Sequence, residues 1–358
     1  MPSTSPFDNL RQLEHDFAAA LAAMLAAQTG LGAYILVLAN AAYDHVLWAQ
    51  LAPALAERHS ELAARVSEAQ RRGDTLDETD DDMQVFIQLH AIGFERLQNM
   101  QRRHADPWTV MFNPLRALRP PRHSGQAYDG LVRAFNASGF HFNKPFLARE
   151  IFWQGDLAGR PTRMLYNKFP FARLHGLLVP EPLRELPQYL SEDMHHWAWE
   201  VCETAGVPGL CLGYNSQGAG ASVNHLHFQS FVQTEPLPVQ HARFSHNGGD
   251  EPYPLPCQRV ADAAESWTQL DHLHQQNQPY NLIYSPGCMH LVARAPQDSP
   301  ALSAQCRGYG WSEMAGVVTR FSLDEYEAFS AGDFADELAS FSVQQQRECW
   351  VSGVMKSE

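Results

Sequence analysis

The chain has 358 residues, of which 45% are hydrophobic and 18% charged, and this is enough apolar material for two or three packed units. It carries 26 Lys and Arg residues against 40 Asp and Glu residues, a net charge of −14. A field of that sign repels a nucleic-acid backbone. The composition therefore argues against nucleic acid as the main partner.

The charge is unevenly distributed along the chain. The stretch from Arg96 to Arg173 holds thirteen basic and four acidic residues, so it carries +9 while the remainder carries −23. Two of the three lysines, Lys144 and Lys168, lie in this stretch. A basic segment in an acidic chain suits a small polyanion such as a nucleotide, and an arginine-rich solvated face is the alternative.

The cysteines, the first residues and an uncharged run near the N-terminus indicate the compartment and whether the chain enters a membrane. The six cysteines are scattered without a Cys-x-x-Cys pair, which indicates neither a zinc knuckle nor a disulfide framework. The first residues lack the pattern of a signal peptide. The uncharged run 17–43 is rich in alanine, is interrupted by glycine and has one-sided apolar spacing, which predicts amphipathic helix rather than a membrane span. We expect a cytoplasmic protein.

Residues 1 to about 105 predict mainly helices, with a short strand at Ala33–Leu38. The acid-rich stretch Arg71–Asp82 predicts a solvated connection between helices, since it lacks the spacing of a calcium loop. From Pro107 to Gly125 the chain becomes rich in proline and arginine, which indicates a domain boundary.

Short strand-like runs follow the boundary, and they alternate with helical segments. The first group comprises strands at Met164–Phe169 and Leu174–Val179, a helix from Ser191 to about Ala205, and strands at Leu210–Tyr214 and His225–Val232. The second group comprises a helix near Ala261–Gln275, apolar runs at Tyr280–Tyr284 and His290–Ala293, and acidic helical segments from Leu323 to the C-terminus.

The strongest functional signal is the segment from Gly213 to Val232, which reads GYNSQGAGASVNHLHFQSFV. Alternate side chains of a strand share one face, so His225, His227 and Gln229 would line one surface. The small residues before them would let backbone amides approach an anion closely.

A second His-x-His pair provides an internal comparison. With 17 histidines in the chain, one such pair is expected by chance. His272 and His274 form a pair in a polar, helical stretch without a glycine loop, and we interpret them as surface histidines. The first pair is interpreted as functional because of its context.

Histidine and glutamine at this spacing suit phosphorus chemistry. A neutral imidazole is a competent nucleophile near neutral pH when one nitrogen is free and an acceptor, often a backbone carbonyl, holds the other. A glutamine can donate to a phosphoryl oxygen but cannot take a proton from water. The pattern therefore favours transfer to an acceptor over hydrolysis.

The motif Asn224-His-Leu-His-Phe-Gln229 resembles the His-x-His-x-Gln branch of the histidine-triad superfamily. That branch contains galactose-1-phosphate uridylyltransferases, diadenosine tetraphosphate phosphorylases and GDP-hexose phosphorylases. Upstream, residues 167–170 and 175–180 resemble the strand pair that precedes the superfamily's helix. Gly213-Tyr-Asn-Ser216, taken with the motif, is most similar to the GDP-hexose phosphorylases.

The resemblance covers roughly residues 110 to 325 and implies roles for particular residues. His227 would be the nucleophile that forms a nucleotidyl-histidine, Gln229 would contact the transferred phosphoryl group, and His225 would support the site. The charge count adds Lys144 and Lys168 as phosphate ligands. The other expected nucleotide- and phosphate-binding residues are Asn215, Ser216, Gly218, Gly220, Ser222, Asn224, Asn167 and His175.

The expected fold is α+β, with a histidine-triad-like antiparallel sheet, flanking helices, two such halves and an N-terminal helical region. We expect the helical region over residues 1–110, the catalytic half over 111–240, and a second α+β half with acidic C-terminal helices over 241–358.

The expected activity is that of a phosphorylase-type nucleotidyltransferase. It would cleave a nucleoside-diphosphate sugar, preferably a GDP-hexose, with phosphate or a sugar phosphate as acceptor. A diadenosine tetraphosphate phosphorylase, a nucleotide hydrolase of the same fold and a non-catalytic nucleotide-binding protein are the alternatives.

Uridylyltransferases often bind structural zinc through paired cysteines near the start of the core, and Gly139–Phe142 occupies that region without cysteine. We expect no zinc and no required cofactor, and leave Mg²⁺ open. The expected partners are the nucleotide sugar and phosphate, with no nucleic acid or membrane; a homodimer stays open.

Overall fold

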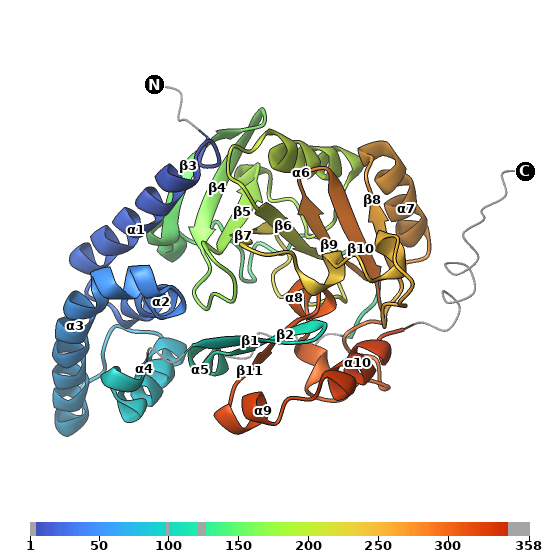
Figure 1. Ribbon diagram of the computed structural model, residues 1–358. Helices are drawn as coiled ribbons and strands as arrows, with labels where there is room; N and C mark the ends of the chain where they lie inside the picture. The colour runs from blue at the N-terminus through green and yellow to red at the C-terminus, as the bar shows by residue number, and fades with distance from the viewer. Residues whose placement is uncertain (1–4, 98–99, 120–126, 343–358) are drawn as a thin grey trace, which may run out of the picture.

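The computed structural model describes residues 5–97, 100–119 and 127–342. It is an α+β fold in which a large sheet carries helices, a block of N-terminal helices flanks one end, and a small sheet lies beneath (Figure 1). The expected fold class is confirmed. In the described part of the chain, no helix combines the length and the apolar character needed to cross a membrane.

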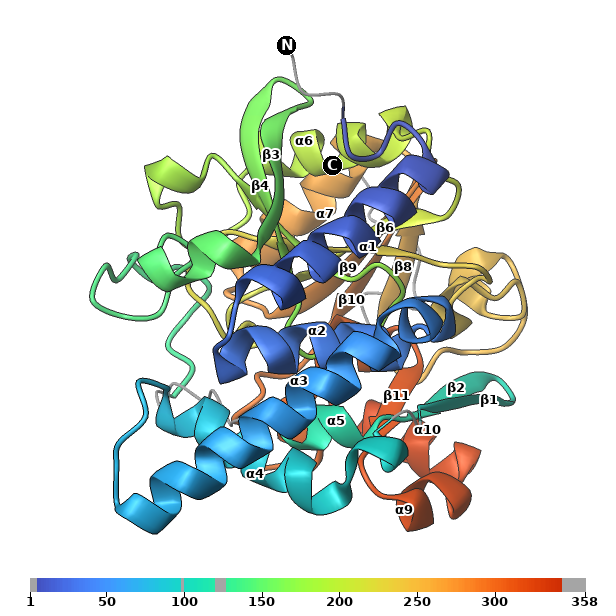
Figure 2. The same cartoon turned by 90° about the vertical axis from the view of Figure 1, so that its left-hand side faces the viewer.

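The N-terminal region forms the helices α1 (Leu10–Ala27), α2 (Leu31–Tyr43), α3 (His45–Arg72) and α4 (Asp80–Ile92). Helix α1 is amphipathic, as predicted, and buries one face that includes Phe17. Figure 2 shows α1 to α3 stacked obliquely along one side of the molecule.

The predicted strand at Ala33–Leu38 is wrong, because this run is part of α2. Every residue from Leu31 to Ala42 is buried. A helix buried on all sides has neither the alternation of a strand nor a one-sided stripe, so an apolar run this short does not distinguish the two.

The predicted connection at Arg71–Asp82 is shorter than expected. Helix α3 ends at Arg72 with Gly73 in the left-handed conformation (φ 72°), and the side chain of Thr79 accepts from the Asp82 amide at the start of α4. The three aspartates 80–82 form the first turn of α4, where negative charge is favourable.

The main sheet has eight antiparallel strands in the order β3-β4-β5-β7-β6-β9-β10-β8. Strands from both expected halves, 111–240 and 241–358, thus join in one sheet. The strands are β3 (Ile151–Leu157), β4 (Arg160–Tyr166), β5 (Gly176–Pro180), β6 (Leu210–Asn215), β7 (Phe228–Val232), β8 (Cys257–Val260), β9 (Tyr280–Ser285) and β10 (Cys288–Ala293).

The two faces of this sheet are covered differently. Helices α1, α6 (Glu192–Thr204) and α7 (Ala263–Gln275) share one apolar core with the first face. The second face packs on a core that includes Trp108 and Trp311, from the small sheet and α8 (Trp311–Met314). The candidate functional residues lie on the second face.

The small sheet joins distant parts of the chain. Strand β2 (Trp108–Phe112) pairs with β1 (Gln101–Ala105) and, in parallel, with β11 (Val317–Arg320). The short helix α5 (Pro114–Ala117) follows β2, and its Arg116 donates to the carbonyl of Phe169 in the β4–β5 connection. This contact brings a residue of the predicted boundary stretch close to the main sheet.

Most other predicted elements agree with the structure. Ser191 caps α6 as expected. The predicted strand at His225–Val232 begins only at Phe228. The acidic C-terminal segments include α9 (Leu323–Glu327) and α10 (Ala331–Ala339), and the prediction for residues 343–358 lies outside the described residues.

Candidate active site around His225 and His227

His227 has the geometry of a neutral nitrogen nucleophile. Its Nδ1 lies 2.8 Å from the carbonyl oxygen of His225, so Nδ1 carries the proton and donates it there. The free lone pair is therefore on Nε2. Burial lowers the pKa of His227 to about 4. The hydrogen bond to the His225 carbonyl acts in the opposite direction but offsets only part of this lowering. The ring is neutral at physiological pH.

Gln188 holds the backbone of His227. The His227 amide donates to Oε1 of Gln188 (2.9 Å), and the His227 carbonyl accepts from its Nε2 (3.2 Å). The same Nε2 donates to the carbonyl of Asn215 (3.0 Å). Because a side chain occupies these positions, β7 cannot begin at His225, and the predicted strand start is corrected to Phe228.

His225 and His227 both contact one aromatic ring. The ring centroid of Phe142 is 5.7 Å from that of His225 and 4.9 Å from that of His227. The Phe142 amide donates to Nδ1 of His225 (3.1 Å), so the proton of this second imidazole is on Nε2. Burial lowers the pKa of His225 to about 4, and the nearby Arg163 contributes to the lowering.

Gln229 of β7 is oriented by His175, the residue that immediately precedes β5. The Phe171 amide can only donate, and it does so to Nδ1 of His175 (3.3 Å). Nε2 of His175 therefore carries the proton and donates to Oε1 of Gln229 (3.0 Å). The amide NH₂ of Gln229 is left as a donor for a phosphoryl oxygen.

His175 itself is fully buried, and Asn167 lies beside it, with Nδ2 3.3 Å from its Nε2. Burial lowers the pKa of His175 to about 3, with a further lowering from Arg116. Both residues were expected to bind nucleotide or phosphate. The structure places His175 behind Gln229 rather than at the surface.

Two arginines of the segment after β2 bring positive charge close to His175. Arg116 stacks over Phe171 at 4.0 Å and donates to the carbonyl of Phe169 (3.0 Å). Arg119 donates to Oγ of Ser222 (3.4 Å). Both guanidinium groups act electrostatically on His175, which contacts Gln229. Arg122, from the same basic run, lies outside the described residues.

The small-residue loop is tied into the protein. Asn215 Oδ1 accepts from the Trp311 amide and from Asn281, and Ser216 Oγ accepts from the Tyr280 amide. These contacts are internal.

The other loop residues that were expected to bind phosphate include both internally packed and exposed residues. Gly218 and Gly220 have positive φ angles of 76° and 93° and pack on Tyr128 and Gly310 respectively. Asn224 Oδ1 accepts from the backbone amide of Gln188 (2.9 Å), so it helps to position the residue that holds His227. Ser222 is exposed and meets Arg119.

The two expected phosphate-binding lysines have different surroundings. Lys168 forms an ion pair with Asp82 of α4. Lys144 donates to the carbonyl of Ala137 (3.2 Å) and lines a cavity beside Phe142. The structure thus engages Lys168 with a carboxylate of the N-terminal helices.

The interpretation of the second His-x-His pair needs one correction. His272 is exposed, as expected, but His274 is half-buried between two tyrosines. Its Nδ1 lies 3.0 Å from the hydroxyl of Tyr189 and its Nε2 2.7 Å from that of Tyr280. Because α7 packs on the sheet, one of the two histidines faces inward and links side chains there.

Gln188, Phe142 and Arg116 are parts of the site that the sequence motif does not predict. Gln188 follows a proline-rich connection that carries no motif, so only the fold reveals its contacts. Arg116 lay in the basic stretch, which was the available signal. Among the described residues, no group of three or more His, Cys, Asp or Glu side chains is placed to hold a metal ion.

The chain is similar to known proteins over this region. Residues 108–231 match the family model described as "GDPGP1-like, N-terminal domain". Over 168 residues the chain is 36% identical to GDP-D-glucose phosphorylase 1 of Homo sapiens, covering 45% of this chain and 40% of the human protein. Over 218 residues it is 27% identical to GDP-L-galactose phosphorylase 2 of Arabidopsis thaliana, covering 54% and 50%. The resemblance to GDP-hexose phosphorylases is confirmed.

The chain thus spans half or less of the length of these curated relatives. Among solved structures it resembles yeast Ap4A phosphorylase Apa2 with a TM-score of 0.48 and 15% identity, covering 75% of this chain and 97% of that chain.

Proposed function

We propose that this protein is a nucleotidyltransferase of the phosphorylase type, which cleaves a GDP-hexose with inorganic phosphate through a nucleotidyl-His227 intermediate. The observation that carries the proposal is the hydrogen bond from His227 Nδ1 to the His225 carbonyl, which leaves Nε2 as a neutral nucleophile. The similarity to GDP-D-glucose and GDP-L-galactose phosphorylases supports the choice of substrate.

In the first step, Nε2 of His227 attacks the α-phosphorus of the nucleotide sugar. An N–P bond forms, the P–O bond to the second phosphate breaks, and hexose 1-phosphate leaves with the electron pair. In the second step, an oxygen of inorganic phosphate attacks the same phosphorus, the N–P bond breaks, and the nucleoside diphosphate is released. Two in-line displacements predict ping-pong kinetics and net retention at phosphorus.

The groups around His227 suit the charge that develops on phosphorus. The amide NH₂ of Gln229 can donate to a phosphoryl oxygen, since its Oε1 already accepts from His175. Arg116 and Arg119 add positive charge near His175, the residue that orients Gln229. None of these groups is a general base for water, which favours phosphate as the acceptor.

Two assays test the proposal. Release of the nucleoside diphosphate from a GDP-hexose should require phosphate, and diadenosine tetraphosphate and a UDP-hexose serve as comparison substrates. Brief exposure to a GDP-hexose without phosphate should add one nucleoside monophosphate to the protein, seen by mass spectrometry, and His227→Ala should abolish this adduct. Cleavage unchanged by phosphate would refute phosphorolysis, and an adduct that survives in His227→Ala would refute the nucleophile.

We also propose that the reaction uses protein groups alone and takes place in the cytoplasm. The five described cysteines are free thiols, which suits a reducing compartment. Assays with a chelator and with added Mg²⁺ test the first point, since the proposal predicts full activity after chelation.

A further inference from the structure

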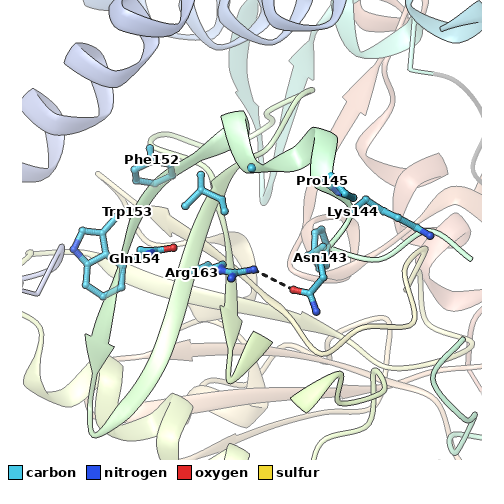
Figure 3. Close-up of a pocket in the computed structure, with 10 residues that line it drawn as sticks. Asn143, Lys144, Pro145, Phe152, Trp153, Gln154 and Arg163 are labelled. Carbon is cyan, nitrogen blue, oxygen red and sulfur yellow. Dashed lines mark hydrogen bonds between the residues drawn. The ribbon is translucent and has the colours of Figure 1, made fainter. Parts of the chain in front are cut away.

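A cavity of about 560 Å³ lies beside the histidine pair, between β3, β4 and the turn of 3-10 helix at Pro145–Glu150 (Figure 3). Its volume lies within the range of small-molecule sites. Phe142 forms the wall between the cavity and the histidines, because its ring contacts both imidazoles. The cavity therefore lies directly next to the site of the proposed reaction, with the Phe142 ring between them.

The strand register decides which side chains face this cavity. Gln154 is paired with Arg163, and Ile151 with Leu165, so each pair shares one face of the sheet. Trp153 pairs with Met164, which belongs to the core under α1 on the opposite face. In Figure 3 the side chain of Gln154 points toward Arg163, while the Trp153 ring points away.

The cavity has apolar walls and a polar edge. Phe142, Ile151 and Pro145 supply apolar surface, and Arg163, Gln154 and Lys144 supply polar groups. No carboxylate lines it among the described residues. Arg163 donates to Asn143 Oδ1 (3.1 Å) through Nη1 only, and Gln154 makes no side-chain hydrogen bond to the described residues. Donors and one amide oxygen are thus available at the edge.

We propose that this cavity binds the nucleobase of the substrate and that Arg163 and Gln154 select guanine; the inference rests on the proposed function. Guanine presents two acceptors, O6 and N7, which an arginine contacts in bidentate fashion. Its N1–H and N2–H groups need an acceptor, which the Gln154 amide oxygen can supply. The flat ring would lie against the apolar walls. Adenine offers a donor where guanine offers O6, and so would meet Arg163 donor to donor.

Equilibrium binding of nucleoside monophosphates tests this without turnover. Titration calorimetry with GMP, 7-deaza-GMP and AMP should show that the unaltered protein binds GMP at least tenfold tighter than either analogue. Arg163→Gln should weaken GMP at least tenfold and leave AMP nearly unchanged. Arg163→Lys keeps the charge but loses the bidentate geometry, so it should also lose the preference for GMP over 7-deaza-GMP.

Arg71→Gln is the matched control, since it removes one positive charge from an exposed position on α3 and should leave all three affinities unchanged. Equal affinity of the unaltered protein for GMP and 7-deaza-GMP would overturn the proposal. An equal loss of GMP and AMP affinity in Arg163→Gln would overturn it too, because it would place a phosphate in the cavity. A protein that prefers GMP but shows no phosphate-dependent cleavage would refute only the proposed function.

Discussion

At the scale of single residues, the reactivity assigned to His227 depends on which nitrogen carries the proton. A neutral imidazole nucleophile needs an acceptor for one of its nitrogens, and for His227 that acceptor is the carbonyl of His225, two residues away. The tautomer is thus set within the motif. What the motif does not contain is the group that holds this short segment in place, which is Gln188.

Gln188→Glu should lower the rate of adduct formation by roughly tenfold or more with little change in substrate affinity. The carboxylate can still accept from the His227 amide but cannot donate to the carbonyls of His227 and Asn215. Leaving these buried acceptors without a donor costs about 1–3 kcal/mol of stability. Single-turnover rates, substrate affinities and thermal unfolding measure the three effects.

Gln275→Ala is a control for loss of a glutamine, because Gln275 lies exposed on α7 and bonds only to Asp271 among the described residues. If Gln188→Glu lowered affinity and left the rate of adduct formation intact, Gln188 would contact substrate rather than position His227.

Adduct formation should be independent of pH between about 8 and 5.5. The pKa of His227 is lowered to about 4 by burial, so the nucleophile is already neutral across this interval. The measurement is the single-turnover rate without phosphate, since phosphate itself titrates near neutral pH. An inflection near 6.5, the ordinary pKa of histidine, would contradict the buried environment seen here.

At the scale of elements, the N-terminal helices reach the edge of the site through the β4–β5 connection. Asn40 of α2 donates to the carbonyl of Asn167 (3.0 Å), and Asp82 of α4 pairs with Lys168. A Cβ at Gly32 would lie 2.7 Å from an oxygen of Asp82, so a side chain there would displace the Asp82 carboxylate. The helical region therefore supports the loop that contains Asn167 and Lys168.

A double-mutant cycle tests this connection. The side chains of Lys168 and Asp82 are only 19% and 14% exposed, so Asp82→Asn and Lys168→Met should each destabilise the protein. The double variant should lose less than the sum, with a coupling of about 1–3 kcal/mol. Urea unfolding measures the cycle.

The same variants decide the role of Lys168. As a partner of Asp82 alone, Lys168→Met should leave kcat/KM within about threefold, and Asp82→Asn should behave alike. A large loss of kcat/KM in Lys168→Met with none in Asp82→Asn would instead return Lys168 to the phosphate site that the charge count suggested.

Elements with their own local signals could be predicted from the sequence, and elements defined by distant contacts could not. Ser191 predicts the start of α6 because serine is a preferred N-cap residue, and its side chain caps the helix. Helix α2 has no such pattern, since it is buried on every side. Strand β7 starts late because Gln188 displaces the ladder at His227, a contact across 39 positions. In the site, the histidines and Gln229 carry a motif, whereas Arg163 and Gln154 meet only through strand register.

At the scale of the whole molecule, the uneven charge is partly neutralised by contacts between distant segments. Arg173 pairs with Glu14 of α1, Lys168 with Asp82 of α4, and Arg160 with Asp193 of α6. The acidic remainder of the chain thus meets part of the basic stretch inside the fold. Among the described residues, Arg116 and Arg119 act electrostatically on His175 and Arg163 acts on His225, so the positive charge at the site is smaller than the segment sum of +9 implies.

The whole fold should lose stability steeply in mild acid. Burial lowers the pKa of six histidines to about 3 or about 4, whereas an unfolded histidine titrates near 6.5. Unfolding below about pH 6.5 therefore takes up protons, and stability present above that pH is lost as pH falls toward 4. The six are His175, His195, His225, His227, His274 and His290.

The urea midpoint should thus change little between pH 8 and 7 and fall markedly between pH 6.5 and 4.5. Each histidine that takes up a full proton on unfolding adds about 1.4 kcal/mol per pH unit to the slope. His290→Asn removes one such group far from the candidate site, so its unfolding free energy should depend less steeply on pH than that of the unaltered protein. A midpoint that stays level down to pH 4.5 would show that these histidines are protonated, or solvated, in the native state.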